Sequence, residues 1–412
     1  MTRSAYWLVN VRLESGYCYE DGAIVGTATD ICHIRVEDGV IAAIAASGAK
    51  PADGLPQQDA AGLLMLPAFK EMHIHIDKTY YGGPWKAVRP AASIFDRFEE
   101  ERRLLPQLLP TAQQRAENML GMLLGYGSTH VRTHCNIDPV VGLNNLEATI
   151  RALRTYAGKI SGEVVAFPQH GLLRSDSAGL VREAMKHGAT HVGGVDPATV
   201  DENIERSLQT IMDIAVEADA GVDIHIHDRG ELGLATMHRL ADLTEEAGRQ
   251  GRVTVSHAFG FAGAIEAAAE LAERYAALGI SITSTVPIGS MIMPIPMLRA
   301  KGVRVELGND SITDHWSPFG TGDCLEKAGR LAELYRHVDE RSLGESLGYI
   351  TGGVIPLDGS GKRIWPAVGD KADAVFVQAG CSAEAVARRA KREAVLVGGT
   401  IAAGSLKDAA VR

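Results

Sequence analysis

The chain has 412 residues, of which 46% are apolar, and carries a formal charge of −10. This length exceeds what one compact core usually organises, so we expect one large domain and one smaller domain. The acidic balance argues against nucleic acid and anionic membrane surfaces as partners, because both would repel the protein.

The sequence predicts a cytoplasmic protein. Its five cysteines show no paired spacing, which is typical of free thiols in a reducing compartment. The N-terminus lacks the apolar core and cleavage pattern of a signal peptide. No apolar run approaches the ~18 residues that a membrane-spanning helix needs. We therefore expect no membrane association.

Residues 1–66 predict a set of short strands. Two β-rich runs, Ile31–Val36 and Val40–Ile44, flank the turn Glu37-Asp38-Gly39. An Asp-Gly pair between two such runs is a hairpin signal. The chain end, residues 361–412, returns to the same β-rich texture. We expect the two terminal segments to pair with each other as one small β-sandwich domain.

Residues 67–360 predict a (β/α)₈ TIM barrel. Eight β-rich runs alternate here with longer segments whose apolar residues recur at three- and four-residue spacing. The runs are Leu66–Asp77, Ser128–Ile137, Glu163–His170, His191–Asp196, Val222–Asp228, Val253–Phe259, Ser281–Pro287 and Val303–Asp310. Eight strand–helix units are the number that closes a parallel barrel. An open doubly wound sheet is the alternative, but no Gly-rich phosphate loop follows any run.

Ligand-type side chains stand near the ends of several of these runs. In a parallel barrel the active site lies at the carboxyl ends of the strands. His73 and His75 are two residues apart, so both imidazoles point to one face of the first strand. His225, His257 and Asp310 follow on the fifth, sixth and eighth runs. Imidazole and carboxylate groups in this arrangement favour a zinc or iron site.

These motifs resemble the amidohydrolase superfamily, and within it the cytosine deaminase branch. The resemblance rests on His73-Ile74-His75-Ile76-Asp77-Lys78-Thr79, Thr129–His134, Val165–Gln169, His225, Ser256-His257, Gly308-Asn309-Asp310 and Asp314–Thr321. It spans nearly the whole chain, including the flanking β segments.

The resemblance implies a set of roles. The ligands of one divalent cation, zinc or iron, would be His73, His75, His225 and Asp310. Asp310 would also accept a proton from the attacking water. His257 would donate a hydrogen bond to the group that becomes tetrahedral, and Gln169 would bind an amide-like edge of the substrate ring.

The number of metal ions follows from the fourth run, His191–Asp196, which contains no lysine. Many binuclear members of the superfamily carry a bridging lysine there. A single metal ion is therefore the prediction.

Departures from the cytosine deaminase motifs concern the proton shuttle and the substrate. The expected Glu after the fifth strand is replaced by Asp228, which we predict to be the catalytic proton shuttle. His227, just before it, is predicted to bind the substrate. His227 or the more distant Glu231 could carry the proton instead. Ser311 stands where the cytosine enzymes have a second acid. The stretch is closer to enzymes that remove an amine or alkylamine from triazine rings, such as N-isopropylammelide amidohydrolase.

Further residues have a functional and a structural interpretation. Lys78 could reach the substrate or form a structural salt bridge, and Trp316 could line the pocket or pack in the core. His134 could equally line the pocket or be structural, whereas we interpret His170 and His191 as structural. The charged run Phe95–Arg103 predicts a solvent-facing helix, with a lid over the barrel mouth as the alternative.

Together these features predict a hydrolase that acts on carbon–nitrogen bonds other than peptide bonds. The leading hypothesis is a deaminase that releases ammonia from an amino-substituted nitrogen heterocycle. Release of an alkylamine from a triazine ring, hydrolysis of a cyclic amide, and a non-catalytic scaffold are the alternatives. A homo-oligomer is compatible with the sequence, which contains no feature that indicates one.

Overall fold

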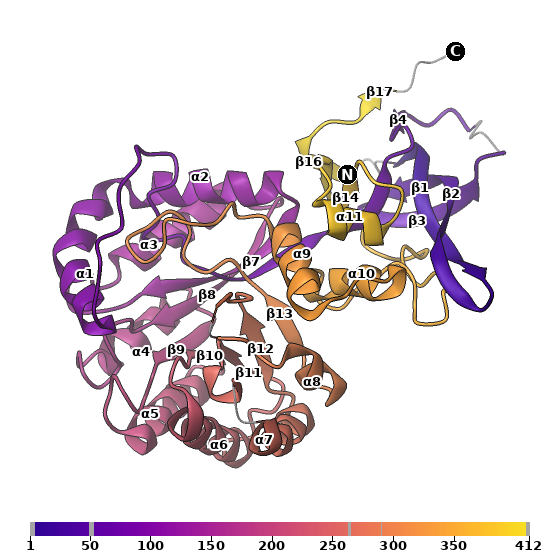
Figure 1. The fold of residues 1–412 in the computed structure, drawn as a ribbon. Coiled ribbons are helices and arrows are strands. Elements are labelled where there is room, and N and C mark those ends of the chain that lie inside the picture. Colours follow the sequence, from indigo (N-terminus) through magenta and orange to yellow (C-terminus); the bar gives the residue numbers. More distant parts are fainter. Residues whose placement is uncertain (1–4, 49–52, 263–264, 290, 409–412) are drawn as a thin grey trace.

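The structure is a computed structural model that describes residues 5–48, 53–262, 265–289 and 291–408 (Figure 1). Its centre is a barrel of eight parallel strands that follow one another in chain order. The strands are β6 (Phe69–Ile74), β7 (Ser128–Asn136), β8 (Ser161–Phe167), β9 (His191–Val195), β10 (Gly221–His225), β11 (Val253–Ser256), β12 (Ser281–Ser284) and β13 (Val305–Leu307). Six strands lie within their predicted runs, whereas β8 begins two residues and β10 one residue before its run. The predicted barrel is confirmed.

The barrel closes where the chain after β13 meets β6. A parallel bridge joins Ile74 to Asp310, and the Asp310 backbone N–H donates to the His73 carbonyl at 2.7 Å. Gly308 makes this approach possible, because a Cβ at that position would lie 2.5 Å from the Cβ of His73. The closure therefore places Asp310 directly beside the histidines of the first barrel strand.

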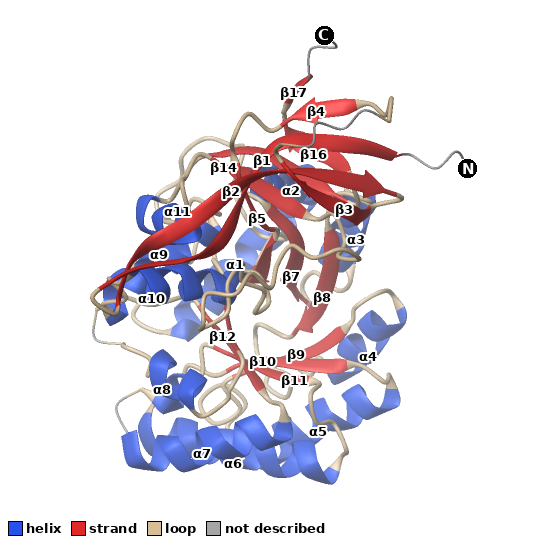
Figure 2. Cartoon of the chain, turned by 90° about the vertical axis from the view of Figure 1, so that its right-hand side faces the viewer, coloured by secondary structure: helices blue, strands red, loops and turns tan. Residues whose placement is uncertain are grey.

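Most helices surround the barrel, while α10 and α11 lie beside the sheet formed by the chain ends (Figures 1 and 2). The helices are α1 (Ile94–Leu108), α2 (Ala112–Gly125), α3 (Asn144–Thr155), α4 (Ala178–Lys186), α5 (Ile204–Glu217), α6 (Gly230–Glu246), α7 (Ile265–Leu278), α8 (Ile295–Ala300), α9 (Cys324–Tyr335), α10 (Glu340–Ser346) and α11 (Ser382–Arg388). In α5, Leu208, Ile211 and Ala215 are all buried at three- and four-residue spacing. Among the described residues, no helix combines the length and apolar character required to cross a bilayer.

Strands from both chain ends form a second sheet, as predicted. It contains β1 (Ala5–Glu20), β2 (Ala23–Glu37), β3 (Val40–Ala46), β4 (Gln57–Asp59), β5 (Leu64–Pro67), β14 (Ala374–Val377), β15 (Arg392–Val397), β16 (Thr400–Gly404) and β17 (Lys407–Asp408). The pairing of β5 with β14 joins the two ends, and the strands share a core that includes Leu8, Ile34 and Phe376. Figure 2 shows this sheet above the barrel.

The predicted hairpin between β2 and β3 is also confirmed. Its two turn residues, Asp38 and Gly39, have φ angles of 49° and 80°. This left-handed backbone is what a two-residue hairpin turn requires.

Candidate active site

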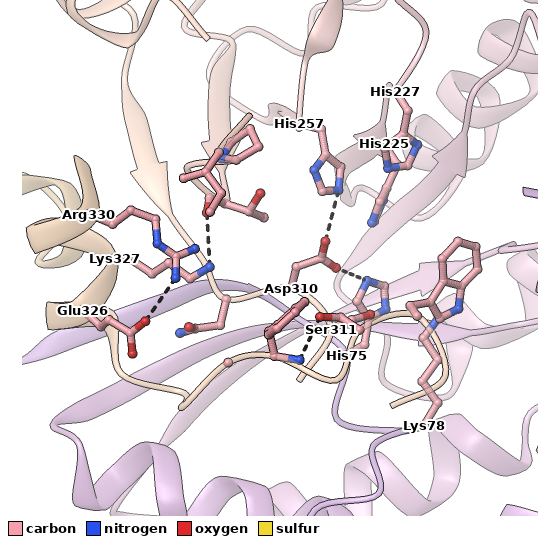
Figure 3. A pocket seen from close by; sticks show the side chains of 18 of the residues that line it. His75, Lys78, His225, His227, His257, Asp310, Ser311, Glu326, Lys327 and Arg330 are labelled. Atoms are coloured by element: carbon pink, nitrogen blue, oxygen red, sulfur yellow. Dashed lines mark hydrogen bonds and ion pairs between the residues drawn. The ribbon is translucent and has the colours of Figure 1, made fainter. Parts of the chain in front are cut away.

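A cavity of about 580 Å³ opens at the carboxyl ends of the barrel strands (Figure 3). Predicted site residues that line it are His75, Lys78, Gln169, His225, His227, His257, Asp310 and Trp316. His73 lies behind this surface and is fully buried. Asp228 is not among the lining residues, so the structure does not bring it to the cavity.

The four predicted metal ligands converge around Asp310. One carboxylate oxygen, Asp310 Oδ1, lies 3.5 Å from His73 Nε2 and 3.2 Å from His75 Nε2. Two overlapping groups have ligand atoms close enough to share an ion: His73 with His75 and Asp310, and His73 with His225 and His257. The predicted ligands thus belong to one cluster, and His257 is geometrically able to join it.

The donor set fits a divalent transition metal. His73 Nε2 and both ring nitrogens of His225 are buried without a hydrogen-bond partner. Buried polar atoms left unpaired are costly and unusual, so their convergence indicates a site built for a ligand. Neutral imidazole nitrogen and carboxylate oxygen suit zinc and iron alike.

A chain of hydrogen bonds orients the His73 imidazole. Ser256 Oγ donates to Asp223 at 2.6 Å, and His73 Nδ1 lies 2.8 Å from the same hydroxyl. Because the serine proton is committed to Asp223, Ser256 accepts the Nδ1 proton of His73. This tautomer leaves the lone pair on Nε2, on the side of Asp310 and the other histidines.

Burial sets the protonation states that metal binding requires. Desolvation lowers the pKa of His75 to about 4, and it lowers the pKa of His225 and His257 well below the usual value. The pKa of Asp310 is lowered as well, because the neighbouring His73 and His75 imidazoles outweigh the desolvation of its carboxylate. At neutral pH the imidazoles of His75, His225 and His257 are therefore neutral and the Asp310 carboxylate is charged.

Backbone strain marks the same end of the barrel. His257 and Asp310 have φ angles of 68° and 63°, and Asp196, just after β9, has φ 36°. Left-handed backbone is uncommon for residues other than glycine, and such residues cluster at functional sites. The positions that follow three barrel strands are thus held in costly conformations by the surrounding fold.

The structure separates the three groups proposed as proton shuttle. His227 lines the cavity, its ring centroid lies 4.4 Å from that of His257, and its Nδ1 lies 2.8 Å from Asp196 Oδ2. Asp228 instead accepts a hydrogen bond from the Thr199 hydroxyl. Glu231 is exposed in the first turn of α6 and does not line the cavity. Of the three, His227 is the one that lines the cavity.

Glu101 was missed by the sequence interpretation. We expected Phe95–Arg103 to be a solvent-facing helix face, yet Glu101 on α1 is fully buried beneath the cavity wall. It binds five side chains that come from four separate segments of the chain: Lys78, Asn136, His170, and the adjacent His315 and Trp316. Burial opposes its charge, but Lys78 and the two histidines outweigh it, so the pKa of Glu101 lies well below the usual value.

Glu101 ties Lys78 and Trp316 to the cavity wall. Its Oε1 lies 3.2 Å from Lys78 Nζ and accepts the indole N–H of Trp316 at 2.7 Å. Lys78 Nζ in turn donates to Gln169 Oε1 at 2.8 Å. Because the amide oxygen of Gln169 is already occupied, its NH₂ group is the part left to meet a substrate.

The remaining histidines take different places. The His134 ring lies 4.2 Å from that of His73, and both of its nitrogens are buried without a partner, although it does not line the cavity. His170 contacts Glu101 and Asp138 inside the protein, which agrees with a structural role. His191 lies at the start of β9, at the opposite end of the barrel.

A (β/α)₈ barrel whose mouth gathers imidazoles and a carboxylate is the architecture of the metal-dependent hydrolases. Comparison with known proteins makes this specific. The profile of the amidohydrolase family matches residues 91–405, and the chain belongs to this family. It is a hydrolase of carbon–nitrogen bonds.

Similar proteins cover nearly the whole chain. It is 46% identical over 410 residues to the uncharacterized protein YahJ of Escherichia coli (strain K12), covering 98% of this chain and 89% of that protein. The structure of N-isopropylammelide isopropylaminohydrolase from Burkholderia multivorans superposes with a TM-score of 0.84 at 30% identity, covering 97% and 98% of the two chains. The structure of 5-methylcytosine deaminase from Klebsiella pneumoniae gives 0.78 at 25%, covering 98% and 99%.

Proposed function

We propose that the protein removes an amino group from a small nitrogen heterocycle by hydrolysis, with one divalent metal ion held by His73, His75, His225 and Asp310. The observation that carries this proposal is the convergence of these four side chains at a cavity that also presents the Gln169 amide. Zinc and iron both match the donor set. A divalent ion there would supply Lewis acidity and hydroxide at neutral pH.

The surrounding residues bind the substrate and move its protons. Gln169 donates from its NH₂ group to an acceptor on the ring, such as a carbonyl oxygen. Asp310 takes the proton of the attacking water. His257 donates a hydrogen bond to the oxygen that is added to the tetrahedral carbon. His227 delivers a proton to the departing nitrogen, because an amide anion is a very poor leaving group. Hydroxide thus replaces the amine on carbon, and the amine leaves protonated.

The leaving group divides the proposal in two. Release of ammonia is the leading form, and the resemblance to 5-methylcytosine deaminase supports it. Release of an alkylamine is the second, supported by the likeness to N-isopropylammelide isopropylaminohydrolase and by the cavity size. A volume of about 580 Å³ exceeds what a single bare ring fills, and it falls in the range of pockets for larger ligands.

Product analysis tests both forms. Metal-replete protein is incubated with cytosine, 5-methylcytosine, isoguanine, a pterin, ammelide and N-isopropylammelide, and ammonia and alkylamine are quantified. Ammonia from a pyrimidine or pterin supports the leading form, and alkylamine alone supports the second. Metal content measured on the same sample identifies zinc or iron. A metal-loaded protein that releases neither product would contradict the proposal.

Cellular location and assembly stay predictions. The five cysteines are all free in the structure, which supports the cytoplasmic prediction. A homo-oligomer is tested by light scattering in solution.

A further inference from the structure

The wall of the cavity formed by α9 carries two cations, Lys327 and Arg330. Figure 3 shows both pointing toward the cavity, on the opposite side of Asp310 from Lys78. Lys327 is only 7% exposed. The side chain of Arg330 is 30% exposed and lies nearer to solvent. A bound ring would therefore lie between Lys78 and this cationic pair.

Lys327 is a buried ammonium that forms no ion pair with any residue that the structure describes. Its only hydrogen bond among the described residues goes to the Thr285 carbonyl at 3.2 Å, and no described carboxylate lies within ion-pair distance. The neighbouring Glu326 is engaged elsewhere, since it accepts from Arg330 at 3.1 Å and from the Thr321 hydroxyl. Burying a charge without a partner is costly unless a ligand supplies the partner.

Lys327 contrasts with Lys78 in the same cavity. Lys78 is just as buried, but its ammonium is satisfied by Glu101 and the Gln169 amide oxygen. Burial and the nearby Arg330 lower the pKa of Lys327, and they outweigh the opposing effect of the Glu71, Asp310 and Glu326 carboxylates, which lie beyond ion-pair distance. Burial of Lys78 is instead outweighed by Glu101, and the pKa of Lys78 is raised. An anion bound beside Lys327 would raise the pKa of the lysine and so oppose the effect of burial.

We infer that Lys327 and Arg330 bind an anionic oxygen of the substrate, either a carboxylate substituent or an ionised ring oxygen. This inference rests on the proposed function, because it places the heterocycle in the same cavity. Gln169 would recognise one edge of the ring and the cationic pair the opposite edge, with the reacting carbon between them at Asp310. The preferred substrate is then an acidic nitrogen heterocycle rather than a neutral one.

Binding of unreactive probes tests this separately from turnover. Uracil-5-carboxylate and uracil-6-carboxylate are compared with the matching carboxamides by calorimetry on the metal-loaded protein. Each pair has nearly the same shape and differs in charge, and uracil has no amino group to lose. We expect at least one carboxylate to bind about tenfold or more tightly than its carboxamide, as charge-assisted hydrogen bonds provide. Equal binding within both pairs would overturn the inference for carboxylates.

The ionised ring oxygen forms the second arm. Cyanuric acid is the probe here, because its ring ionises but has no amino group to lose. Its binding, followed from pH 5 to pH 9 in the native protein and in Lys327→Met, shows whether affinity for the native protein grows as the ring loses its proton. Affinity that rises with ionisation only in the native protein supports a ring oxyanion as the ligand of Lys327. If both arms fail, the inference is wrong.

Variants separate Lys327 from the metal as the source of any anion preference. Lys327→Met should bring the ratio of carboxylate to carboxamide affinity close to one while metal content is unchanged. Lys327→Arg should retain the preference for the carboxylate. Lys301→Met is the matched control, because Lys301 pairs with Glu273 on the surface. Arg330→Met, at the more exposed position, should lower the preference in part and remains informative if Lys327→Met does not fold.

Two results distinguish the inference from the function it rests on. Amine release from neutral heterocycles without any preference for anions would leave the proposed function intact and overturn the inference. A preference for anions that depends on Lys327, in a protein that releases no amine, would support the anion site and contradict the deaminase. A preference that persists in Lys327→Met would place the anion on the metal and overturn the inference.

Discussion

At the amino end of the barrel, buried charges are paired inside the protein. Arg132 donates to Glu163 at 2.7 Å, to Asp223 at 3.0 Å and to the Thr254 hydroxyl at 2.9 Å. A second cavity lies at this end and is lined by Arg132, Glu163 and Thr254 among others. None of its described lining side chains has a buried polar atom without a hydrogen-bond partner. The charges here satisfy one another.

The carboxyl end differs. Among the described residues, the buried His73 Nε2 and both ring nitrogens of His134 and His225 have no hydrogen-bond partner, and no carboxylate pairs with the Lys327 ammonium. Each unpaired buried group costs about 1–3 kcal/mol. One fold thus has an end that contributes stability and an end that gives up stability to keep groups free for ligands. Variants at the amino end should therefore lower stability and spare activity, whereas variants at the carboxyl end should chiefly lower activity.

The largest expected effect on activity is that of Asp310→Asn. Asparagine keeps the side-chain shape, tolerates the left-handed backbone at this position, and leaves the backbone bond to His73 in place. It removes the proton acceptor and a charged ligand, so we expect kcat to fall by about 10³-fold or more and metal content to fall. Kinetics and metal analysis measure both, with circular dichroism as the check on folding. Full activity would contradict the assignment.

Next in size is the loss expected from His227→Asn. His227 faces the cavity, so we expect kcat to fall about 10²–10⁴-fold with metal retained, as for loss of a general acid. Asp228→Asn is the matched comparison, because Asp228 contacts Thr199 and does not line the cavity. It should change kcat only a few-fold. The opposite order of effects would make Asp228 the shuttle.

Glu101→Gln is expected to weaken both stability and substrate binding. Breaking a fully buried ion pair by removing one partner costs about 3–5 kcal/mol, and here Lys78 would be left buried and unpaired. Because Lys78 holds the Gln169 oxygen, KM for the heterocycle should rise more than kcat falls. Denaturant unfolding and kinetics measure these changes. Glu99→Gln, on the exposed face of α1, is the control and should have almost no effect.

The difference between Glu101 and Asp310 shows what local sequence can predict. The barrel strands could be predicted because each corresponds to a β-rich run. The proposed ligands His73, His75, His225 and Asp310 could be singled out because they lie near the ends of three of these runs, and a barrel brings its strand ends together. Glu101 belongs to a helix, and its partners come from distant segments. One signal was present: Phe98, Glu101, Leu105 and Leu108 form a buried stripe at helical spacing, with the carboxylate inside it.

The choice between His227 and Asp228 could not be made from sequence for a different reason. Neighbouring residues in a loop can point in opposite directions, and the path after β10 is set by Asp196, which contacts the His227 ring and the Asp228 backbone. The free ammonium of Lys327 is equally a property of the assembled cavity. Whether a buried lysine is paired depends on carboxylates that the spacing of residues along the chain does not place.

Glu163→Gln, at the amino end, should affect stability and leave activity within about twofold. Burial disfavours its charge, but His130 and Arg132 outweigh burial and lower the pKa of Glu163 in the folded protein. A lowered pKa stabilises the fold above the unfolded value of about 4.3, and the effect is lost as pH falls towards the folded value. The native protein should therefore exceed the variant by about 1–2 kcal/mol at pH 7, limited because 31% of the side chain is exposed, and the gap should narrow below about pH 4. Denaturant unfolding of both proteins from pH 7 to pH 3 measures the gap. A constant gap, or a loss of activity at pH 7, would show that the two ends of the barrel are not separate in this way.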